Sequence, residues 1–387
     1  MSEWQKVNLG DCCEITSSKR IFFSEYVESG IPFYRSKEII EKGKGEEISH
    51  PLYISKEKYD EIKGKYGVPQ KGDLLLTAVG SLGTPFVVKD DSPFYFKDGN
   101  LVWLKHFQDI DPIFLYYWIK SENGYNALYN IAIGSAQKAL TIAAIKGYEI
   151  PLPPLQTQHR IANILSRYDS LIENYQKQIK LLEEAAQRLY KEWFVDLRFP
   201  GHENTKIVDG VPEGWTPSQL GQLAEFKRGK TITKKDVIDG DIPVVAGGLE
   251  PAYYCNKSNT AERVITISGS GANAGFTRMY FEKVWASDCS FVDASVTPFL
   301  HFVYCYLKAN KTTIDNMQKG AAQPHVYAKD INSLSICIPI ESVLKSFEGT
   351  ASKYFDTISS FQSQIHLLTE ARDRLLPKLM GGEIVLS

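Results

Sequence analysis

Several short stretches contain residue types used in catalytic or nucleotide-binding sites, but none completes the corresponding motif. Residues 111–114, Asp-Pro-Ile-Phe, come closest to the Asn-Pro-Pro-Tyr/Phe sequence that holds a flipped adenine in amino-methyltransferases, yet the third position is wrong. A helix that begins at Pro112 accounts for the stretch. Gly229-Lys230-Thr231 ends like a phosphate-binding loop, but Ala224 occupies the place of its first glycine.

The remaining candidates for chemistry are also incomplete. Ser268-Gly269-Ser270-Gly271 lacks the third glycine and the acidic residue of a dinucleotide site, and Glu61-Ile62-Lys63 supplies only the last part of a nuclease metal set. The seven histidines are unclustered, and the six cysteines form no C-x-x-C pair, as expected for reduced thiols rather than a zinc site or a disulfide frame. We therefore predict no catalytic residue, no metal site and no cofactor on this chain.

Composition leaves the function open. The net charge of -2 neither demands nor excludes a nucleic-acid partner, because phosphate binding depends on local basic surfaces rather than on the total charge. Residues 1–10 are polar and lack the apolar core of a signal peptide, and no apolar run is long enough to span a membrane. We expect a cytoplasmic protein.

The chain contains an internal repeat, which must position the residues that carry its function. Near the start of each half the offset is 211 positions: Trp4, Leu9, Gly10 and Ile31-Pro32 return as Trp215, Leu220, Gly221 and Ile242-Pro243. Near the end of each half the offset is 186: residues 134–137, Gly-Ser-Ala-Gln, return at 320–323 as Gly-Ala-Ala-Gln, and Pro153 returns as Pro339. The first half therefore carries about 25 more residues in its middle.

Each half ends in a long amphipathic segment, Gln156 to Phe194 and Phe347 to Leu379, with apolar residues at alternating steps of four and three. The predicted seam contains Ile161, Leu165, Tyr168, Ile172, Tyr175, Ile179, Leu182, Ala186, Leu189 and Trp193 on the first helix, and Phe347, Ala351, Tyr354, Ile358, Phe361, Ile365, Leu368, Leu375 and Leu379 on the second. A helix of about 38 residues is a rod of about 57 Å whose narrow apolar stripe needs a partner.

The two rods are predicted to pack antiparallel and to hold two globules apart. A compact domain usually has its chain ends close together, so the second rod must run back along the first. Arg372 interrupts the seam, and we expect it to reach Glu183 or Glu184 or to extend to solvent. Short apolar strands (residues 73–77, 85–88, 101–104 and 263–267) and helices at 112–120 and 298–308 indicate mixed globules, so the fold class is α+β.

The repeats and rods resemble the specificity subunits of type I restriction-modification systems. The resemblance is carried by residues 150–158 (Ile-Pro-Leu-Pro-Pro-Leu-Gln, with Gln158), residues 189–202 (Leu-Tyr-Lys-Glu-Trp-Phe-Val-Asp-Leu-Arg-Phe-Pro-Gly-His) and residues 374–384 (Arg-Leu-Leu-Pro-Lys-Leu-Met-Gly-Gly-Glu-Ile). It implies two target recognition domains, 1–150 and 201–338, and two conserved helical regions, 151–200 and 339–387. At the start of the second helix, Ile338-Pro339-Ile340-Glu341 departs from the family's double proline.

What the resemblance implies is a non-catalytic subunit that reads double-stranded DNA. Each globule would read one half of a bipartite, asymmetric target, and the rods would dock two methyltransferase subunits that bind S-adenosylmethionine and methylate adenine N6. A motor-nuclease subunit, using ATP and Mg²⁺, would join for restriction. Two other classes stay open at this point: a self-sufficient DNA methyltransferase and a purely structural coiled-coil connector.

DNA contacts are expected from loops rich in basic and amide residues, because Arg and Lys reach phosphate or guanine and Gln pairs with adenine. The candidates are Lys19, Arg20, Arg35, Ser36, Lys37, Gln137, Lys138, Arg228, Lys230, Lys234, Gln323 and His325. The basic cluster at 227–235 also fits a solubilising loop. Gln137-Lys138 and Gln323-His325 fit a structural turn before each rod as well as they fit base readout.

Overall fold

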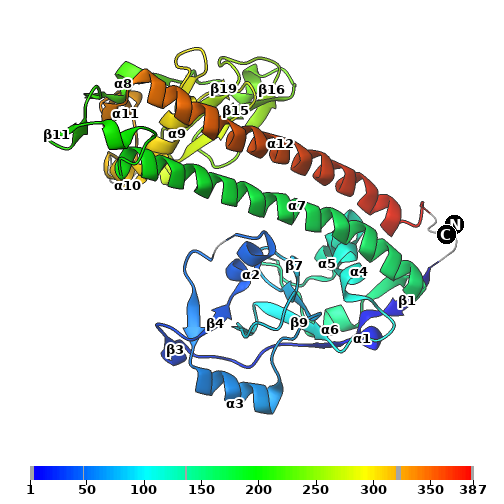
Figure 1. The fold of residues 1–387 in the computed structure, drawn as a ribbon. Coiled ribbons are helices and arrows are strands. Elements are labelled where there is room, and N and C mark those ends of the chain that lie inside the picture. The colour runs from blue at the N-terminus through cyan, green and yellow to red at the C-terminus, as the bar shows by residue number, and fades with distance from the viewer. Residues whose placement is uncertain (1–3, 47, 136, 320–323, 385–387) are drawn as a thin grey trace. The chain divides into compact units, whose positions relative to one another are not determined.

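The computed structural model describes residues 4–46, 48–135, 137–319 and 324–384 (Figure 1). The chain divides into two compact units, residues 1–174 with 364–387 and residues 175–363. Each unit contains one globule and a part of both long helices. Among the described residues, no helix combines the length and the apolarity needed to cross a membrane.

The globule of the first unit contains two four-stranded sheets. One has the order β2-β9-β6-β7 (Glu14–Thr16, Leu101–Lys105, Leu74–Thr77, Pro85–Val87), and all its neighbours are antiparallel. The other has the order β3-β5-β4-β8 (Tyr26–Val27, Leu52–Ile54, Ile31–Tyr34, Tyr95–Phe96), with β4 and β8 parallel. The strand β6 is fully buried, as its run of apolar residues predicts.

The described residues of this globule also form six α-helices: α1 (Leu9–Cys12), α2 (Ser36–Gly43), α3 (Lys56–Tyr66), α4 (Pro112–Lys120), α5 (Glu122–Ile131) and α6 (Ile142–Lys146). The predicted helix that begins at Pro112 is confirmed. The Asp111 carboxylate caps it by accepting hydrogen bonds from the amides of Ile113 (2.7 Å) and Phe114 (2.9 Å). Residues 111–114 therefore form a helix start.

The globule of the second unit repeats this plan, with fewer α-helices among its described residues. Its sheets have the orders β14-β20-β17-β18 (Lys227–Arg228, Cys289–Asp293, Val264–Ser268, Thr277–Tyr280) and β16-β15-β19 (Tyr253–Cys255, Ile242–Val245, Trp285–Ala286). The helices are α8 (Leu220–Leu223), α9 (Leu300–Ala309), α10 (Lys311–Asn316) and α11 (Ala328–Asn332), and a small hairpin, β11-β12 (Ile207–Val208, Val211–Pro212), precedes them. The predicted helix at 298–308 begins two residues late because Phe299 is not helical.

A two-stranded ladder closes each globule, and the two ladders share one register. In the first unit β1 (Gln5–Asn8) pairs with β10 (Glu149–Leu152) so that Gln5 faces Leu152. In the second unit β13 (Thr216–Gln219) pairs with β21 (Ser335–Ile338) so that Thr216 faces Ile338. The first strands differ by 211 positions and the second strands by 186, which are the two offsets of the sequence repeat.

The two long helices are α7 (Leu155–Tyr190), which continues into a π-helical turn at Lys191–Val195, and α12 (Glu341–Met380). In the first unit the beginning of α7 shares a core with the end of α12, where Leu165 and Leu379 are buried. In the second unit the end of α7 shares a core with the beginning of α12, and the rings of Tyr175 and Phe361 stack at 4.8 Å. The helices are therefore antiparallel, and no residue of the predicted seam is exposed.

The expected partners of Arg372 were wrong. Its guanidinium binds the Asp169 carboxylate (Nη1 to Oδ1, 2.6 Å) and that of Asp373 (2.8 Å), and the Tyr117 hydroxyl donates to the other oxygen of Asp169 (2.6 Å). In an antiparallel pair, a residue late in one helix faces a residue early in the other. Asp169 is therefore within reach, whereas Glu183 and Glu184, near the other end of α7, are not.

Candidate nucleic-acid interface

Both globules build the same backbone frame beyond their central strands, β6 and β17. In the first, the amide of Ala78 donates to the Asn100 carbonyl (2.8 Å), and the amide of Leu140 donates to the Ala78 carbonyl (2.9 Å). In the second, the amide of Gly269 donates to the Asp288 carbonyl (3.2 Å), and the amide of Val326 donates to the Gly269 carbonyl (3.1 Å). Each bond of one frame has its counterpart in the other.

In the sequence, the repeated Gly-Ser-Ala-Gln and Gly-Ala-Ala-Gln stretches are each flanked by two residues that pair with one another. Ile133 and Ala139 exchange two backbone hydrogen bonds, and so do Lys319 and His325, the residues 186 positions later. Ala139 also bridges to Val79, and His325 bridges to Ser270. Ala139 and His325 therefore lie against the loop that follows the central strand of their own globule, while Gln323 itself lies outside the described residues.

In the first globule this frame borders a cavity of about 550 Å³. The cavity is lined by Ser36, Lys37, Ile40, Glu41, Lys44, Glu46, Val79, Gly80, Ser81, Asn100 and Gln137. It brings together three of the residues predicted to contact DNA, Ser36, Lys37 and Gln137, which come from the start of α2 and from the repeated stretch. The ammonium, hydroxyl and amide groups of the lining can bind phosphates and base edges, and two carboxylates, those of Glu41 and Glu46, lie among them.

Local contacts orient the side chains of this lining. The Ser36 hydroxyl donates to the Asn100 carbonyl (3.2 Å), which ties the start of α2 to the frame. The Lys37 ammonium donates to the Ser49 hydroxyl (3.2 Å) and lies 3.6 Å from the Glu41 carboxylate, but more than half of its side chain stays exposed.

The other predicted residues of the first globule are placed differently. The Arg35 guanidinium is held by the buried carboxylate of Glu38 (Nε to Oε2, 3.1 Å), and although burial opposes the shift, these hydrogen bonds lower the pKa of Glu38. Arg20 pairs with Asp98 (2.9 Å) and is largely exposed. Lys19 and Lys138 do not line the cavity, and each lies over a tyrosine ring, of Tyr66 (4.5 Å) and Tyr129 (3.6 Å) respectively.

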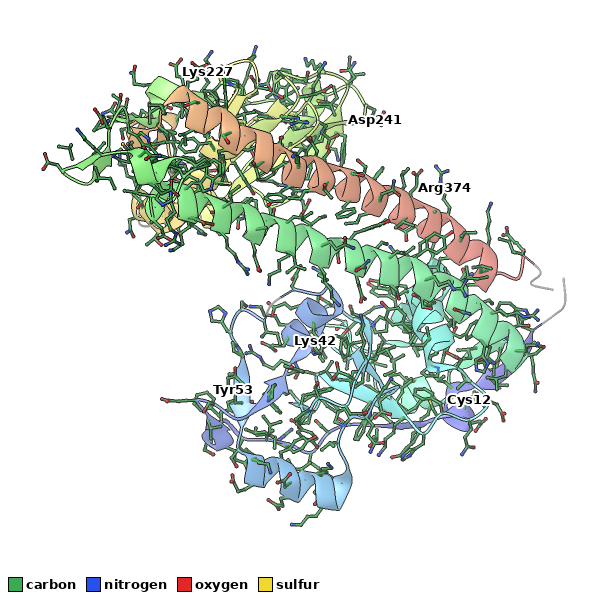
Figure 2. All side chains as sticks on the ribbon, viewed as in Figure 1. Cys12, Lys42, Tyr53, Lys227, Asp241 and Arg374 are labelled. Atoms are coloured by element: carbon green, nitrogen blue, oxygen red, sulfur yellow. The ribbon has the colours of Figure 1, made fainter. Side chains whose placement is uncertain are left out.

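In the second globule the basic cluster is exposed. Lys227 projects from the strand β14 (Figure 2), and the neighbouring Arg228 lies 3.8 Å from the Asp288 carboxylate. Within the described part of the chain, no hydrogen bond or ion pair engages the ammonium groups of Lys230 and Lys234. The His325 ring stacks on Tyr327 (5.9 Å).

Sequence reasoning missed two residues of these faces, Asn100 and Asp288. Each precedes a strand directly, β9 and β20, and its carbonyl belongs to the frame. The Ser270 hydroxyl donates to the Asp288 carboxylate. Position before a strand was the only available signal, because the two residues differ in type and no motif includes them.

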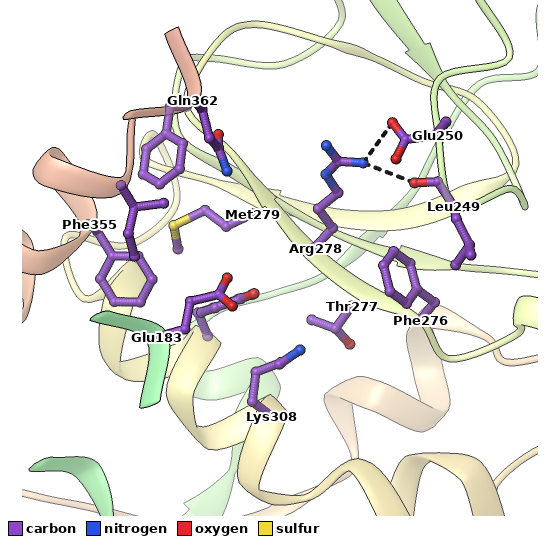
Figure 3. A pocket seen from close by; sticks show the side chains of 13 residues that line it. Glu183, Leu249, Glu250, Phe276, Thr277, Arg278, Met279, Lys308, Phe355 and Gln362 are labelled. Atoms are coloured by element: carbon purple, nitrogen blue, oxygen red, sulfur yellow. Dashed lines mark hydrogen bonds and ion pairs between the residues drawn. The ribbon is translucent and has the colours of Figure 1, made fainter. Parts of the chain in front are cut away.

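A second cavity, of about 380 Å³, lies in the second unit between α7, α9, α12 and β18 (Figure 3). Burial raises the pKa of the Glu183 carboxyl that lines it, although Lys308 and Arg278 oppose the shift. Arg278 donates to the Leu249 carbonyl (2.9 Å) and to Glu250 (3.2 Å). Among the described residues, no three metal-ligating side chains converge here or elsewhere.

The chain is similar to several known proteins. It matches the model of the type I restriction modification DNA specificity domain twice, over residues 1–184 and 212–373. It is 29% identical to the type I restriction enzyme MjaIX specificity subunit of Methanocaldococcus jannaschii, over 81% of this chain and 78% of that one. It is 34% identical to a putative type I restriction enzyme specificity subunit of Haemophilus influenzae, over 48% and 45% of the two chains.

A solved structure has the same fold. The S subunit of a type I restriction-modification system from M. genitalium superposes with a TM-score of 0.63, at 19% identity, over 97% of this chain and 96% of that one. The sheet orders, the shared ladder register and the twofold match of the domain model all describe one duplicated unit. The chain thus belongs to the family of type I restriction-modification DNA specificity subunits, whose members are non-catalytic.

Proposed function

We propose that each globule reads one half of a bipartite, asymmetric DNA target through the face described above. The duplicated frame is the observation that carries the proposal. It fixes the backbone of both faces in the same way while the side chains on it differ, which is what two readers of different sequences require. Base edges carry sequence information, whereas phosphate contacts set position, so the differing side chains would specify and the lysines would position.

The two long helices, in this proposal, dock two adenine-N6 methyltransferase subunits. Leu181 on α7 is 63% exposed, and Leu367 on α12, its counterpart in the repeat, is 56% exposed. Each lies one turn before the first member of an exposed glutamate–arginine pair, Glu184–Arg188 and Glu370–Arg374. Seam packing explains why buried repeat positions match, but exposed positions that match are best explained by two copies of one partner.

The catalytic cofactors would belong to the partners. S-adenosylmethionine would bind to the methyltransferase subunits, and ATP with Mg²⁺ would bind to a motor-nuclease subunit in the complete complex. A subunit that acts on the cell's own DNA would lie in the cytoplasm.

Co-expression with the methyltransferase subunit, followed by genome-wide mapping of N6-methyladenine, tests this function. We expect a split motif that requires both chains. Methylation by this chain alone would favour a self-sufficient methyltransferase, and the absence of any motif would favour a structural connector. Exchange of residues 1–150 with those of another family member should change one half-site and leave the other intact.

The docking role has its own test. Leu181→Ser and Leu367→Ser should each weaken binding of one methyltransferase subunit without loss of folding, because both side chains are exposed. Leu182→Asp or Leu368→Asp should loosen the helix pair itself and impair assembly more severely. Native mass spectrometry of the complexes measures both effects, and full assembly of all four variants would contradict the proposed dock.

A further inference from the structure

Asn100 and Asp288 occupy equivalent positions in the two globules. Besides the shared carbonyl bonds, the residues that follow them are paired alike, because Leu101 faces Thr77 in the first sheet and Cys289 faces Ser268 in the second. These backbone bonds fix each position without help from its side chain. The side chain is therefore free to differ, and it does, as an amide in one globule and a carboxylate in the other.

The surroundings of the two side chains point toward a ligand. Asn100 lines the 550 Å³ cavity beside Lys37 and Gln137, and no described residue hydrogen-bonds to its amide group. The amide thus keeps a donor and an acceptor available, the pair that adenine offers through N7 and N6. In the first globule this position faces the same space as the predicted DNA contacts.

Asp288 offers acceptors only. Its side chain is 40% exposed, one carboxylate oxygen accepts from Ser270, and the other lies 3.8 Å from the Arg228 guanidinium. A carboxylate would be repelled by phosphates, and Arg228 offsets that charge. An acceptor-only group can bind the exocyclic amino groups of cytosine N4 or adenine N6, and it disfavours the O6 of guanine and the O4 of thymine.

We infer that Asn100 and Asp288 are specificity-determining residues, each reading one base pair of its half-site, and that Asp288 selects a base with an exocyclic amino group. The inference rests on the proposed function, since it assumes that both globules read DNA. It adds which residues distinguish the two half-sites and what chemistry the second one favours.

The test uses the full chain in complex with its methyltransferase subunits. Once mapping has defined the wild-type motif, binding is measured to duplexes that carry each of the four base pairs at every position of both half-sites. Asp288→Asn should change the preference at one position of the second half-site by about 5- to 100-fold and leave the first half-site unchanged. Asn100→Asp should change the preference at one position of the first half-site and leave the second half-site unchanged.

Matched variants separate base reading from folding. Asp239→Asn makes the same chemical change at an exposed loop position of the second globule and should leave every preference unchanged. Asp288→Glu keeps the carboxylate and should keep the preferred class of base, and Ser270→Ala should weaken binding without changing that class. If Asp288→Asn does not fold, these two variants decide, because a change of preferred base in either contradicts the inference.

Two outcomes would overturn it. Unchanged preferences in folded Asp288→Asn and Asn100→Asp would show that neither residue reads a base, and an equal loss for all duplexes would show a structural role only. Either result leaves the wild-type split motif in place. The proposed function fails separately, if the wild-type complex methylates no split motif.

Discussion

Between an inner strand of one sheet and the central strand of the other, the two globules take different routes. In the first, the chain leaves β4 and forms the helices α2 and α3 before it reaches the central strand β6; in the second, it passes from β15 through β16 to β17 without a helix. The additional residues of the first half are thus largely these two helices. The start of α2 supplies Ser36 and Lys37 to the cavity, whereas the same place in the second globule holds Gly247 and Gly248.

The globules also bind the long helices by different polar contacts. In the first unit the Tyr117 hydroxyl and the Arg372 guanidinium share the Asp169 carboxylate. In the second unit Glu348 of α12 accepts from the Phe302 amide (2.8 Å) and binds the buried His301 ring (2.7 Å). Backbone pairing is thus the part of the repeat that is kept, while both the proposed DNA-binding face and the attachment to the helices have diverged.

The largest expected effect is the loss of stability when one buried residue is truncated in the core of each unit. Phe347 is fully buried among the rings of Trp193, Phe194 and Phe302 in the second unit, so Phe347→Ala should cost about 3–5 kcal/mol there. Its repeat counterpart Ile161 is buried in the core of the first unit, and Ile161→Ala should cost about 2–5 kcal/mol there. Native-state hydrogen exchange measures the stability of each unit separately. Equal destabilisation of both units by one variant would show that the two units unfold together.

A smaller effect tests the polar attachment of the first unit. Arg372→Met leaves Asp169 without its cation, and because both side chains are about one-fifth exposed, we expect a loss of about 2 kcal/mol rather than the 3–5 kcal/mol of a fully buried pair. The matched control is Arg374→Met, which removes an exposed i,i+4 pair on the same helix (Figure 2) and should cost less than about 0.5 kcal/mol. Similar losses for the two variants would show that the buried network adds nothing.

The effect of pH on the stability of the second unit should be smaller than the loss expected for Arg372→Met. Because burial raises the pKa of Glu183, the folded state holds a proton that the unfolded chain has already lost, so its contribution to stability is present below the ordinary glutamate pKa and is lost as pH rises through the raised value. Glu183→Gln should therefore raise stability at neutral pH and leave it unchanged at low pH. Thermal unfolding from pH 4 to pH 8 measures this, and a gain confined to low pH would reverse the assigned sign.

The smallest effect concerns phosphate contacts. Lys37→Ala in the first globule and Lys230→Ala in the second should each weaken DNA binding a few-fold for all sequences and lower the magnitude of the salt slope by about 1. Lys65→Ala serves as a control because Lys65 is paired with Glu61 on α3 (2.9 Å) and does not line the cavity. A change in base preference would instead assign Lys37 or Lys230 to base readout.

Sequence reasoning predicted the parts of the fold that rest on pattern. The two offsets anticipate the ladder register, and the apolar spacing anticipates both long helices, because period and repeat are visible without coordinates. The ion pair between Arg35 and Glu38 could also have been predicted, because residues three apart on a helix are neighbours. The cavity could not have been predicted, because strand pairing brings Ser36, Asn100 and Gln137 together. These residues are 37 to 101 positions apart in the sequence, and no local pattern links them.

The shared register of the two closing ladders has a consequence for the gene. A globule followed by its helix is a complete genetic module, since β1 and β10 close on each other before α7 begins, and β13 and β21 do so before α12 begins. Duplication of one such module would yield this chain. A shortened gene that encoded one module alone would make a protein able to pair its helix with a second copy of itself. The resulting homodimer would carry two identical readers, and its target would be a palindrome.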